Sequence, residues 1–153
     1  MDISIEEILS TTIQLNSSDI FKSRNIDGII LHKLKKYEGK CNKNGYIVKD
    51  STELIDRQIG KIVNIDNKSL IEYKINYKIK SIVPTKGDIY ECIIKNITKM
   101  GLICYVKYGE LDDLKNSPIL VIVPKEYCDI EKQKIDSKIR FRLLEKLQTS
   151  FNI

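Results

Sequence analysis

Tryptophan is absent from this 153-residue chain, and histidine occurs only once, as His32. No cysteine or carboxylate stands at ligand spacing from that histidine, and no two cysteines form a C-x-x-C pair. A zinc site therefore has little support, and we expect neither a metal nor a cofactor. We instead expect the cysteines to be small core residues in a reducing compartment: they are Cys41, Cys92, Cys104 and Cys128.

Long hydrophobic runs are also missing, since no stretch approaches the roughly 20 apolar residues of a membrane-spanning helix. The opening residues, "MDISIEEILS", are acidic and lack both a basic segment and a long apolar segment. They therefore do not resemble a secretory signal. We expect an intracellular protein that does not enter a membrane.

Catalytic patterns are scarce as well. The sequence shows no nucleophile–base pair, no phosphate-binding loop and no metal cluster. Cys41 is better explained by core packing than as a nucleophile, because the only histidine lies inside a helical segment of its own. We expect the chain to have no catalytic residues.

What the chain does contain is a 42% hydrophobic fraction, enough for a core, and a 31% charged fraction. The net charge is +5, carried mostly by lysine and spread evenly along the chain. Such an excess favours contact with RNA or DNA without requiring it. Heavy use of isoleucine, lysine and asparagine is typical of an AT-rich genome, such as that of a virus or a parasite.

The first half of the chain predicts a small antiparallel sheet with one helix. A strand is expected in the second half of "ISIEEILSTTIQL", ending at the polar "NSSD". A helix is expected in "NIDGIILHKLKKYEGK", with Asn25 as N-cap and Gly39 after its end. Its apolar face would consist of Ile26, Ile29, Ile30, Leu34 and Tyr37. An Asn-Gly turn precedes a short strand in "CNKNGYIVKD", and alternation in "LIEYKINYKIKSIV" predicts a half-buried strand joined to "GKIV" by the hairpin loop "IDNKS".

The second half predicts a barrel. Residues 84–87, "PTKG", form the expected junction between a domain at 1–83 and a domain at 84–153. Strands are expected at 88–97, 102–108 and 119–123, followed by "KIRFRLLEKL" and a short "SFNI". Five short strands with one longer interruption describe a five-stranded OB-type β-barrel. The expected fold class is therefore α+β.

One face of this barrel is a candidate surface for single-stranded nucleic acid. The first strand changes parity, which predicts a bulge near Lys95 and Asn96, and Gly101 gives the sharp turn to the next strand. The outward side chains would then form an apolar strip edged by lysines, and such a face suits stacking and phosphate contacts. The candidate RNA-binding residues are Ile93, Lys95, Lys99, Ile103, Tyr105 and Lys107.

Several of these segments together resemble one family. "GDIYECIIKNITKMGLICYV" is similar to the opening of the OB domain in the larger stalk subunit of archaeal and eukaryotic-type multisubunit DNA-directed RNA polymerases. "LHKLKKYEGKCNKNGYIV" resembles that family's helix and the E-G-x-C and G-Y-I-V segments that follow it. "GKIVN" and "EYKINYKIKSIVPTKGD" are similar to its G-x-I hairpin, F-x-V-x-Y strand and P-x-x-G-E junction. The resemblance covers residues 26–106 in order and with similar spacing, and the ends of the chain match less well.

This resemblance implies a non-catalytic transcription subunit. A cellular subunit would be located in the nucleus, and a viral version would be located in the cytoplasm or the virion. An N-terminal tip domain would dock on the large subunits of the polymerase core, the OB domain would guide nascent RNA, and the family usually adds a small helical partner. Where relatives carry aromatic residues around the glycine, this chain has Met100 and Ile103. RNA binding should therefore be weak and mostly electrostatic. The residues that correspond to the docking loops are Asn16, Phe21, Asn64, Ile65, Asp66, Asn67 and Lys68.

Two other classes of function compete with this interpretation. One is a free-standing OB-fold RNA-binding or translation-factor-like module, which the tip-like first half argues against, because such a module needs only the barrel. The other is an enzyme, for which no catalytic pattern is present.

Overall fold

A computed structural model describes residues 3–22 and 24–143 of the chain. Its internal contacts divide the chain between Val83 and Pro84 into two compact units. We call Ile3–Val83 the N-terminal unit and the part that begins at Pro84 the C-terminal unit. Both are built mainly from antiparallel strands, and the helices are few, so the fold class is α+β in the broad sense.

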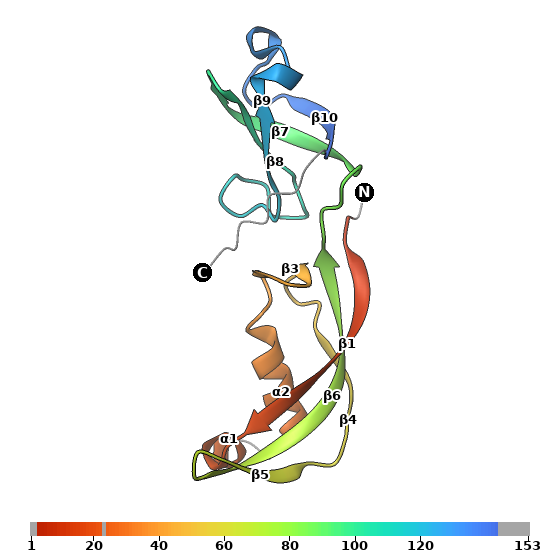
Figure 1. Cartoon of the computed structure of the whole chain (residues 1–153), viewed down its shortest axis with the longest axis vertical. Helices are drawn as coiled ribbons and strands as arrows, with labels where there is room; N and C mark the ends of the chain where they lie inside the picture. The colour runs from red at the N-terminus through yellow and green to blue at the C-terminus, as the bar shows by residue number, and fades with distance from the viewer. Residues whose placement is uncertain (1–2, 23, 144–153) are drawn as a thin grey trace. The chain divides into compact units, whose positions relative to one another are not determined.

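The N-terminal unit is a six-stranded sheet organised around one long central strand, β6 (Figure 1). One edge of β6 pairs with β1 along the whole length of β1, and the other edge pairs in turn with β3, β4 and β5. A short hairpin joins β2 to β3. The bounds are β1 Ile5–Leu15, β2 Cys41–Asn42, β3 Gly45–Ile47, β4 Glu53–Arg57, β5 Lys61–Ile65 and β6 Lys68–Ile82.

Alternation of apolar and polar residues explains β6. Tyr73, Ile75 and Ile79 are buried, whereas Lys74 between them is exposed, as expected for a strand with one covered face. The predicted strand and its hairpin to β5 are therefore confirmed. β1, however, begins at Ile5, so the first half of "ISIEEILSTTIQL" belongs to the strand as well.

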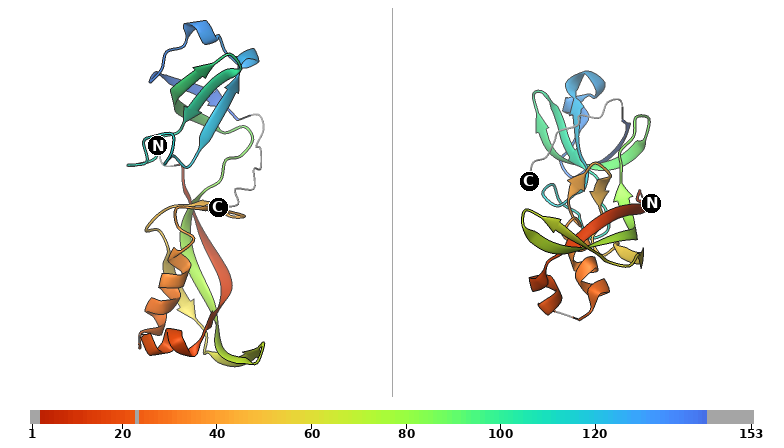
Figure 2. Two further views of the ribbon diagram at one scale, coloured as in Figure 1. Left: turned by 90° about the vertical axis from the view of Figure 1, so that its left-hand side faces the viewer. Right: turned by 60° about the horizontal axis from the view of Figure 1, so that its bottom comes forward.

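Two helices, α1 Ser17–Lys22 and α2 Ile26–Lys35, cover one face of this sheet (Figure 2). The second was predicted, and the Asn25 side chain accepts the Gly28 amide as a helix N-cap should. Gly28 is explained by the same cap, because a Cβ there would lie 2.9 Å from the Asn25 side chain. The sequence does not predict the first helix, because "NSSD" resembles the polar end of a strand.

The core of the N-terminal unit lies between α2 and the sheet. Its buried members are Leu15, Ile30, Leu34, Tyr73 and Ile75, and each contributes about 1.5–3 kcal/mol by leaving water. The prediction that Tyr37 shares the apolar face of the helix is wrong. Tyr37 follows the end of α2 and is 59% exposed.

The C-terminal unit contains a curled four-stranded antiparallel sheet in the order β10-β7-β8-β9. Three consecutive strands pair as neighbours, and the fourth returns beside the first, which is the Greek-key arrangement. Two 3-10 helices, η1 Lys125–Tyr127 and η2 Ile130–Lys132, precede the last strand. The strands are β7 Ile89–Thr98, β8 Gly101–Tyr105, β9 Leu120–Pro124 and β10 Lys138–Arg142.

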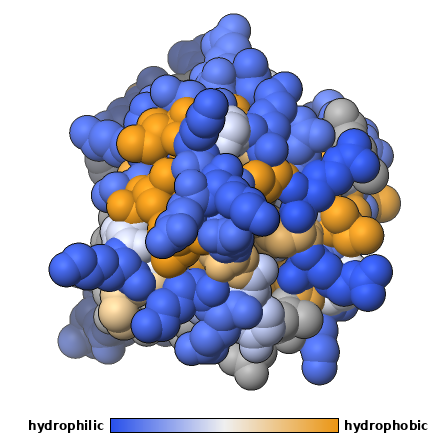
Figure 3. All heavy atoms as spheres, turned by 90° about the horizontal axis from the view of Figure 1, so that it is seen from above, coloured by the Kyte–Doolittle hydropathy of each residue, from blue (hydrophilic) through white to orange (hydrophobic). Residues whose placement is uncertain are grey.

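These four strands fall short of the five-stranded barrel that the sequence predicts. The segment "SFNI", expected as the short last strand, lies outside the described residues. The inner face of the sheet nevertheless has the expected parity, with Cys92 and Ile94 of β7 and Leu102 and Cys104 of β8 all buried. On the face seen in Figure 3, hydrophobic side chains form separate patches between hydrophilic ones.

No helix within residues 3–22 and 24–143 is both long enough and apolar enough to cross a membrane.

Candidate functional site

The β5–β6 hairpin presents the first group of candidate docking residues. Its two turn residues, Asp66 and Asn67, have φ values of 51° and 61°, the left-handed conformation that two-residue hairpin turns require and that Asp and Asn tolerate. The side chain of Asn64 accepts a hydrogen bond from the Ser69 hydroxyl at 2.9 Å. All five predicted residues of this hairpin are exposed: Asn64, Ile65, Asp66, Asn67 and Lys68.

The other two docking candidates belong to the start of α1 and to its outer surface. Asn16 and Asp19 exchange hydrogen bonds, each side chain accepting the other's backbone amide, at 2.8 and 3.0 Å. The bond from the Asn16 amide is the main reason that the pKa of Asp19 lies below its usual value. Asn16 therefore caps the helix, whereas Phe21, 89% exposed, has no packing role in its own unit.

Two further exposed apolar residues of the N-terminal unit were missed. Ile59 is 90% exposed in the connection between β4 and β5, and Ile62 is 78% exposed on β5. This connection, α1 and the hairpin lie at the same end of the unit (Figure 1). The sequence contains a signal for these exposed residues. β5 has apolar residues on both of its faces, which a strand with one solvated face does not need. We call Phe21, Ile59, Ile62 and Ile65 the tip residues.

The second candidate surface is the outer face of the curled sheet. The predicted bulge is confirmed: the β7–β8 register shifts between Ile94 and Asn96, at Lys95. Ile103 lies across from Asn96 on one side and Ile122 on the other. Ile93 and Ile103 are half-buried, and the candidate lysines Lys95, Lys99 and Lys107 are exposed.

The prediction that Tyr105 stands on an exposed face is wrong. Tyr105 is only 5% exposed, and its hydroxyl lies 3.2 Å from the Asp112 carbonyl oxygen and 3.3 Å from the Asp112 carboxylate. Burial, together with Asp112, raises the pKa of this phenol. The segment after β8 folds back over the strand, so a side chain that points outward by register is covered. Tyr105 offers no stacking surface in this conformation.

Two of the three lysines are partly neutralised by neighbouring carboxylates. Lys107 lies 3.2 Å from Asp112, and Lys95 lies 4.0 Å from Asp136. Lys99, in the β7–β8 turn, forms no ion pair with any described residue. The positive charge available at this surface is therefore smaller than the number of lysines indicates.

Residues of β9 and β10 extend the same face and were not predicted to belong to it. Lys138 lies across from Ile93, and Arg140 lies across from Glu91, to whose carboxylate it comes within 3.6 Å. Ile122 is 72% exposed on β9. Their membership depends on strand order, because β10 returns beside β7 from about 45 residues later in the sequence, and spacing along the chain does not reveal it.

Reactive side chains are few in the described part of the chain. Burial raises the pKa of Cys92 to about 12 and that of Cys104 to about 11, so both are protonated, poorly nucleophilic thiols at neutral pH. The prediction that the cysteines are core residues is confirmed for Cys92 and Cys104 and is wrong for Cys41, which is exposed on the short edge strand β2. Cys128 is half-buried. Within residues 3–22 and 24–143, no group of three or more His, Cys, Asp or Glu side chains could hold a metal ion.

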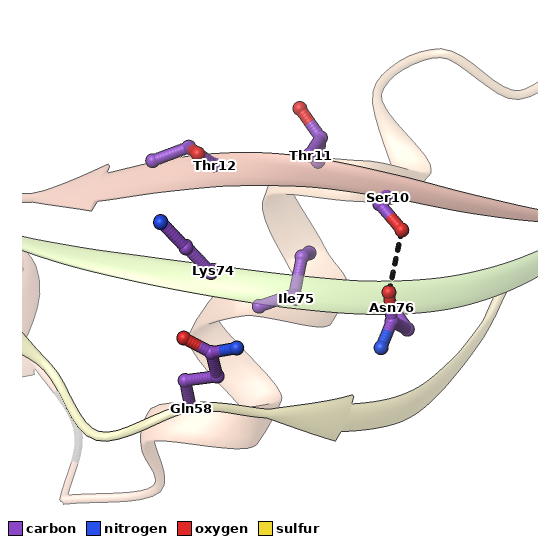
Figure 4. Close-up of a pocket in the computed structure, with 7 residues that line it drawn as sticks. All are labelled: Ser10, Thr11, Thr12, Gln58, Lys74, Ile75 and Asn76. Atoms are coloured by element: carbon purple, nitrogen blue, oxygen red, sulfur yellow. Dashed lines mark hydrogen bonds between the residues drawn. The ribbon is translucent and has the colours of Figure 1, made fainter.

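A shallow hollow of about 290 Å³ lies over β1, β6 and the end of β4 (Figure 4). The Ser10 hydroxyl donates to the Asn76 side chain at 2.6 Å, and the Asn76 amide donates to Asp56 at 2.8 Å. Ser10 is thus held by an amide and has no base beside it among the residues that line the hollow. This arrangement joins three strands.

Comparison with protein-family models and with curated proteins finds no match to this chain.

Proposed function

We propose that this protein is a non-catalytic subunit of a multisubunit DNA-directed RNA polymerase, of the larger stalk-subunit type. The N-terminal unit docks on the polymerase core through its tip residues and hairpin. The C-terminal unit serves as an OB-type domain beside the nascent RNA. The sequence resemblance over residues 26–106 supports this proposal, because it follows the order of the elements from α2 to β8.

The observation that carries the proposal is that several exposed apolar side chains belong to elements at one end of the N-terminal unit (Figure 1). Phe21 and Ile59 are about nine-tenths exposed, Ile62 is 78% exposed and Ile65 is 41% exposed. Burying one such side chain is worth about 1.5–3 kcal/mol, and exposed apolar clusters rimmed by polar residues commonly mark protein contacts. Polar Asn64, Asp66 and Asn67 form that rim on the hairpin.

The Greek-key order of β7 to β10 supports the OB-type assignment for the C-terminal unit. The OB fold is a five-stranded Greek-key barrel, and the neighbour order β10-β7-β8-β9 corresponds to its first four strands. Contact with RNA would rest on Lys95, Lys99 and Lys107, with Ile93 and Ile103 between them. Since Tyr105 is covered, this contact would be weak and largely electrostatic.

Co-purification tests the proposal. An affinity-tagged chain, expressed where its natural partners are made, should be recovered with the two very large chains of a polymerase core. Replacing the apolar and turn residues of the hairpin together, as Ile65→Asp with Asn67→Ala, should reduce recovery of these chains at least tenfold. A hydrophobic anchor replaced by a charge leaves an unpaired carboxylate in the interface.

The matched control is Lys99→Ala in the C-terminal unit, which should leave recovery unchanged. Recovery of the wild-type chain alone or with RNA only would overturn the proposal and favour a free-standing RNA-binding module. Equal recovery of the wild-type and hairpin variants with the polymerase would retain the function and reject this hairpin as the docking element.

A further inference from the structure

The first strand of the N-terminal unit has one long backbone edge that no described strand occupies. β1 runs for 11 residues and pairs with β6 in an unbroken antiparallel register, from Ile5 opposite Ser81 to Leu15 opposite Ile71. Figure 4 shows β6 and then β4 on one side of it. Within the described residues β1 pairs with β6 alone, so the alternate N–H and C=O groups on its other edge have no sheet partner.

Apart from Glu6 and Glu7 at its start, this edge lacks the features with which proteins usually protect such strands. Protected edges are short, carry a proline or a lysine, or are bent by a bulge. β1 has no proline, no lysine and no register shift, and residues 8–15 contain no charge at all. Ile8 is 69% exposed at the start of this stretch. A long, regular, uncharged edge of this kind is a template for an added strand.

We propose that the free edge of β1 binds an extended segment of another protein, which adds to the sheet as an antiparallel strand. Backbone hydrogen bonds supply the affinity, and the two charges at the start of β1 set the orientation. Glu6 and Glu7 form no ion pair with any described residue, although Lys80 lies across from Glu6 on β6. The segment that fits is uncharged along most of its length and basic at its C-terminal end, which an antiparallel arrangement places beside these glutamates.

Charge favours a different chain over a second copy of this one. β1 contains two glutamates and no basic residue, so in an antiparallel pair of β1 strands neither strand would offer a cation to the glutamates of the other. A segment that ends in lysine or arginine neutralises them.

Hydrogen exchange on the full chain provides the test. The probe is a synthetic peptide of alternating valine and threonine that ends in two lysines. In the free protein, alternate amides of β1 should exchange rapidly, and saturating peptide should slow those same amides at least tenfold. No protection by the peptide would overturn the proposal. Protection of every β1 amide in the free chain would also overturn it. Sedimentation would then identify what covers the edge: a monomeric mass indicates the chain itself, and a dimeric mass indicates a second copy.

A charge exchange separates recognition from a folding defect. The double variant Glu6→Lys with Glu7→Lys should bind the lysine-ended peptide about tenfold more weakly, since attraction becomes repulsion. It should bind a glutamate-ended version of the same peptide more tightly. The control, Glu126→Lys with Glu131→Lys on the two exposed 3-10 helices, changes the net charge equally and should alter neither affinity. If both double variants weaken peptide binding equally, the effect comes from overall charge, and the edge of β1 is rejected as the binding site. None of these positions is a tip residue, so this test and the co-purification test fail independently.

Discussion

At the residue scale, Gly101 determines how closely β8 can approach β9. A Cβ at this position would lie 2.1 Å from the carbonyl oxygen of Val123 and 3.0 Å from the Cα of Pro124. The φ angle is 150°, at the edge of the region that side chains avoid. The sequence indicated a turn glycine here, but the contact with β9 could not be inferred, because it comes from a strand 20 residues away.

The variant Gly101→Ala should therefore destabilise the protein by about 3 kcal/mol or more, since both backbone strands must move apart. Chemical denaturation monitored by circular dichroism measures this. Gly109→Ala is the matched control: its φ is 58°, and nothing lies within 4 Å of the added Cβ, so the left-handed backbone alone should cost about 1 kcal/mol. Equal destabilisation by the two variants would show that the close contact with β9 contributes nothing.

Glu38 illustrates how one carboxylate can organise a turn. Its two oxygens accept the backbone amides of Asp50 at 3.0 Å and Thr52 at 3.1 Å. Burial alone would raise the pKa of Glu38, but these hydrogen bonds outweigh it, and the pKa lies below the usual value. The carboxylate therefore stabilises the segment that leads from β3 into β4.

A depressed pKa gives this contribution a definite dependence on pH. The folded protein releases the proton more readily than the unfolded chain, so the stabilisation is complete above the unfolded value, near 4.5, and is lost as the pH falls through the folded value. Glu38→Gln should cost about 1 kcal/mol at pH 7 and much less at pH 3. Urea denaturation of both proteins at the two pH values checks this, and an equal cost at both would mean that the charge is irrelevant.

At the scale of elements, the periodicity of apolar residues predicts the helices and strands that bury one face. It does not predict a helix that depends on its cap, or the burial of a side chain by a neighbouring segment. The sequence predicts β6 because its apolar residues recur at every second position. It predicts α2 because its apolar residues recur at intervals of three to four. α1 was missed because its six residues are too few for a period, and the reciprocal Asn16–Asp19 cap was hidden in a stretch that resembles a loop. Tyr105 was misplaced because parity gives the direction of a side chain and not what lies over it.

The segment that covers Tyr105 leads to a prediction about this element. If Tyr105 is a structural residue, Tyr105→Phe should lose the hydrogen bond to Asp112 and about 1 kcal/mol of stability, whereas Tyr105→Ala should lose about 3–5 kcal/mol. Affinity of the folded Tyr105→Phe variant for single-stranded RNA should equal that of the wild type. Thermal unfolding and a fluorescence-anisotropy titration supply the two readouts. Weaker RNA binding by the phenylalanine variant at unchanged stability would restore Tyr105 to the binding surface.

At the scale of the whole molecule, the candidate surfaces of the two units differ in the residues that were proposed to make contact. The N-terminal unit exposes apolar side chains around Phe21 and Ile62, where a partner can remove them from water. The candidate surface of the C-terminal unit carries lysines, two of which already have acidic neighbours. Lysine positions could be read from the sequence, but their neutralisation by Asp112 and Asp136 could not, because it depends on how the connecting segments fold. Under the proposed function, the first surface would serve stable attachment and the second transient electrostatic contact.

This difference predicts how the full chain binds single-stranded RNA. With two or three phosphates neutralised, the logarithm of the affinity should fall with the logarithm of salt concentration at a slope of about −2, or about tenfold between 50 and 200 mM salt. Binding should be feeble at physiological salt and indifferent to sequence, because no aromatic platform is exposed among the candidate residues. Even so, a transcript held nearby on a polymerase would reach a high effective concentration.

The triple variant Lys95→Ala, Lys99→Ala and Lys107→Ala should flatten this slope toward zero, whereas replacing the exposed Lys35, Lys61 and Lys74 of the N-terminal unit should leave it nearly unchanged. Anisotropy titrations of a labelled oligouridine and of a mixed sequence, each at four salt concentrations, measure both the slope and the sequence preference. Tight binding that is insensitive to salt and specific for one sequence would contradict the electrostatic account. If the salt dependence of the affinity flattens equally in the two triple variants, RNA binding is not localised to this surface. The lysines near β7 and β8 would then act only through the net charge.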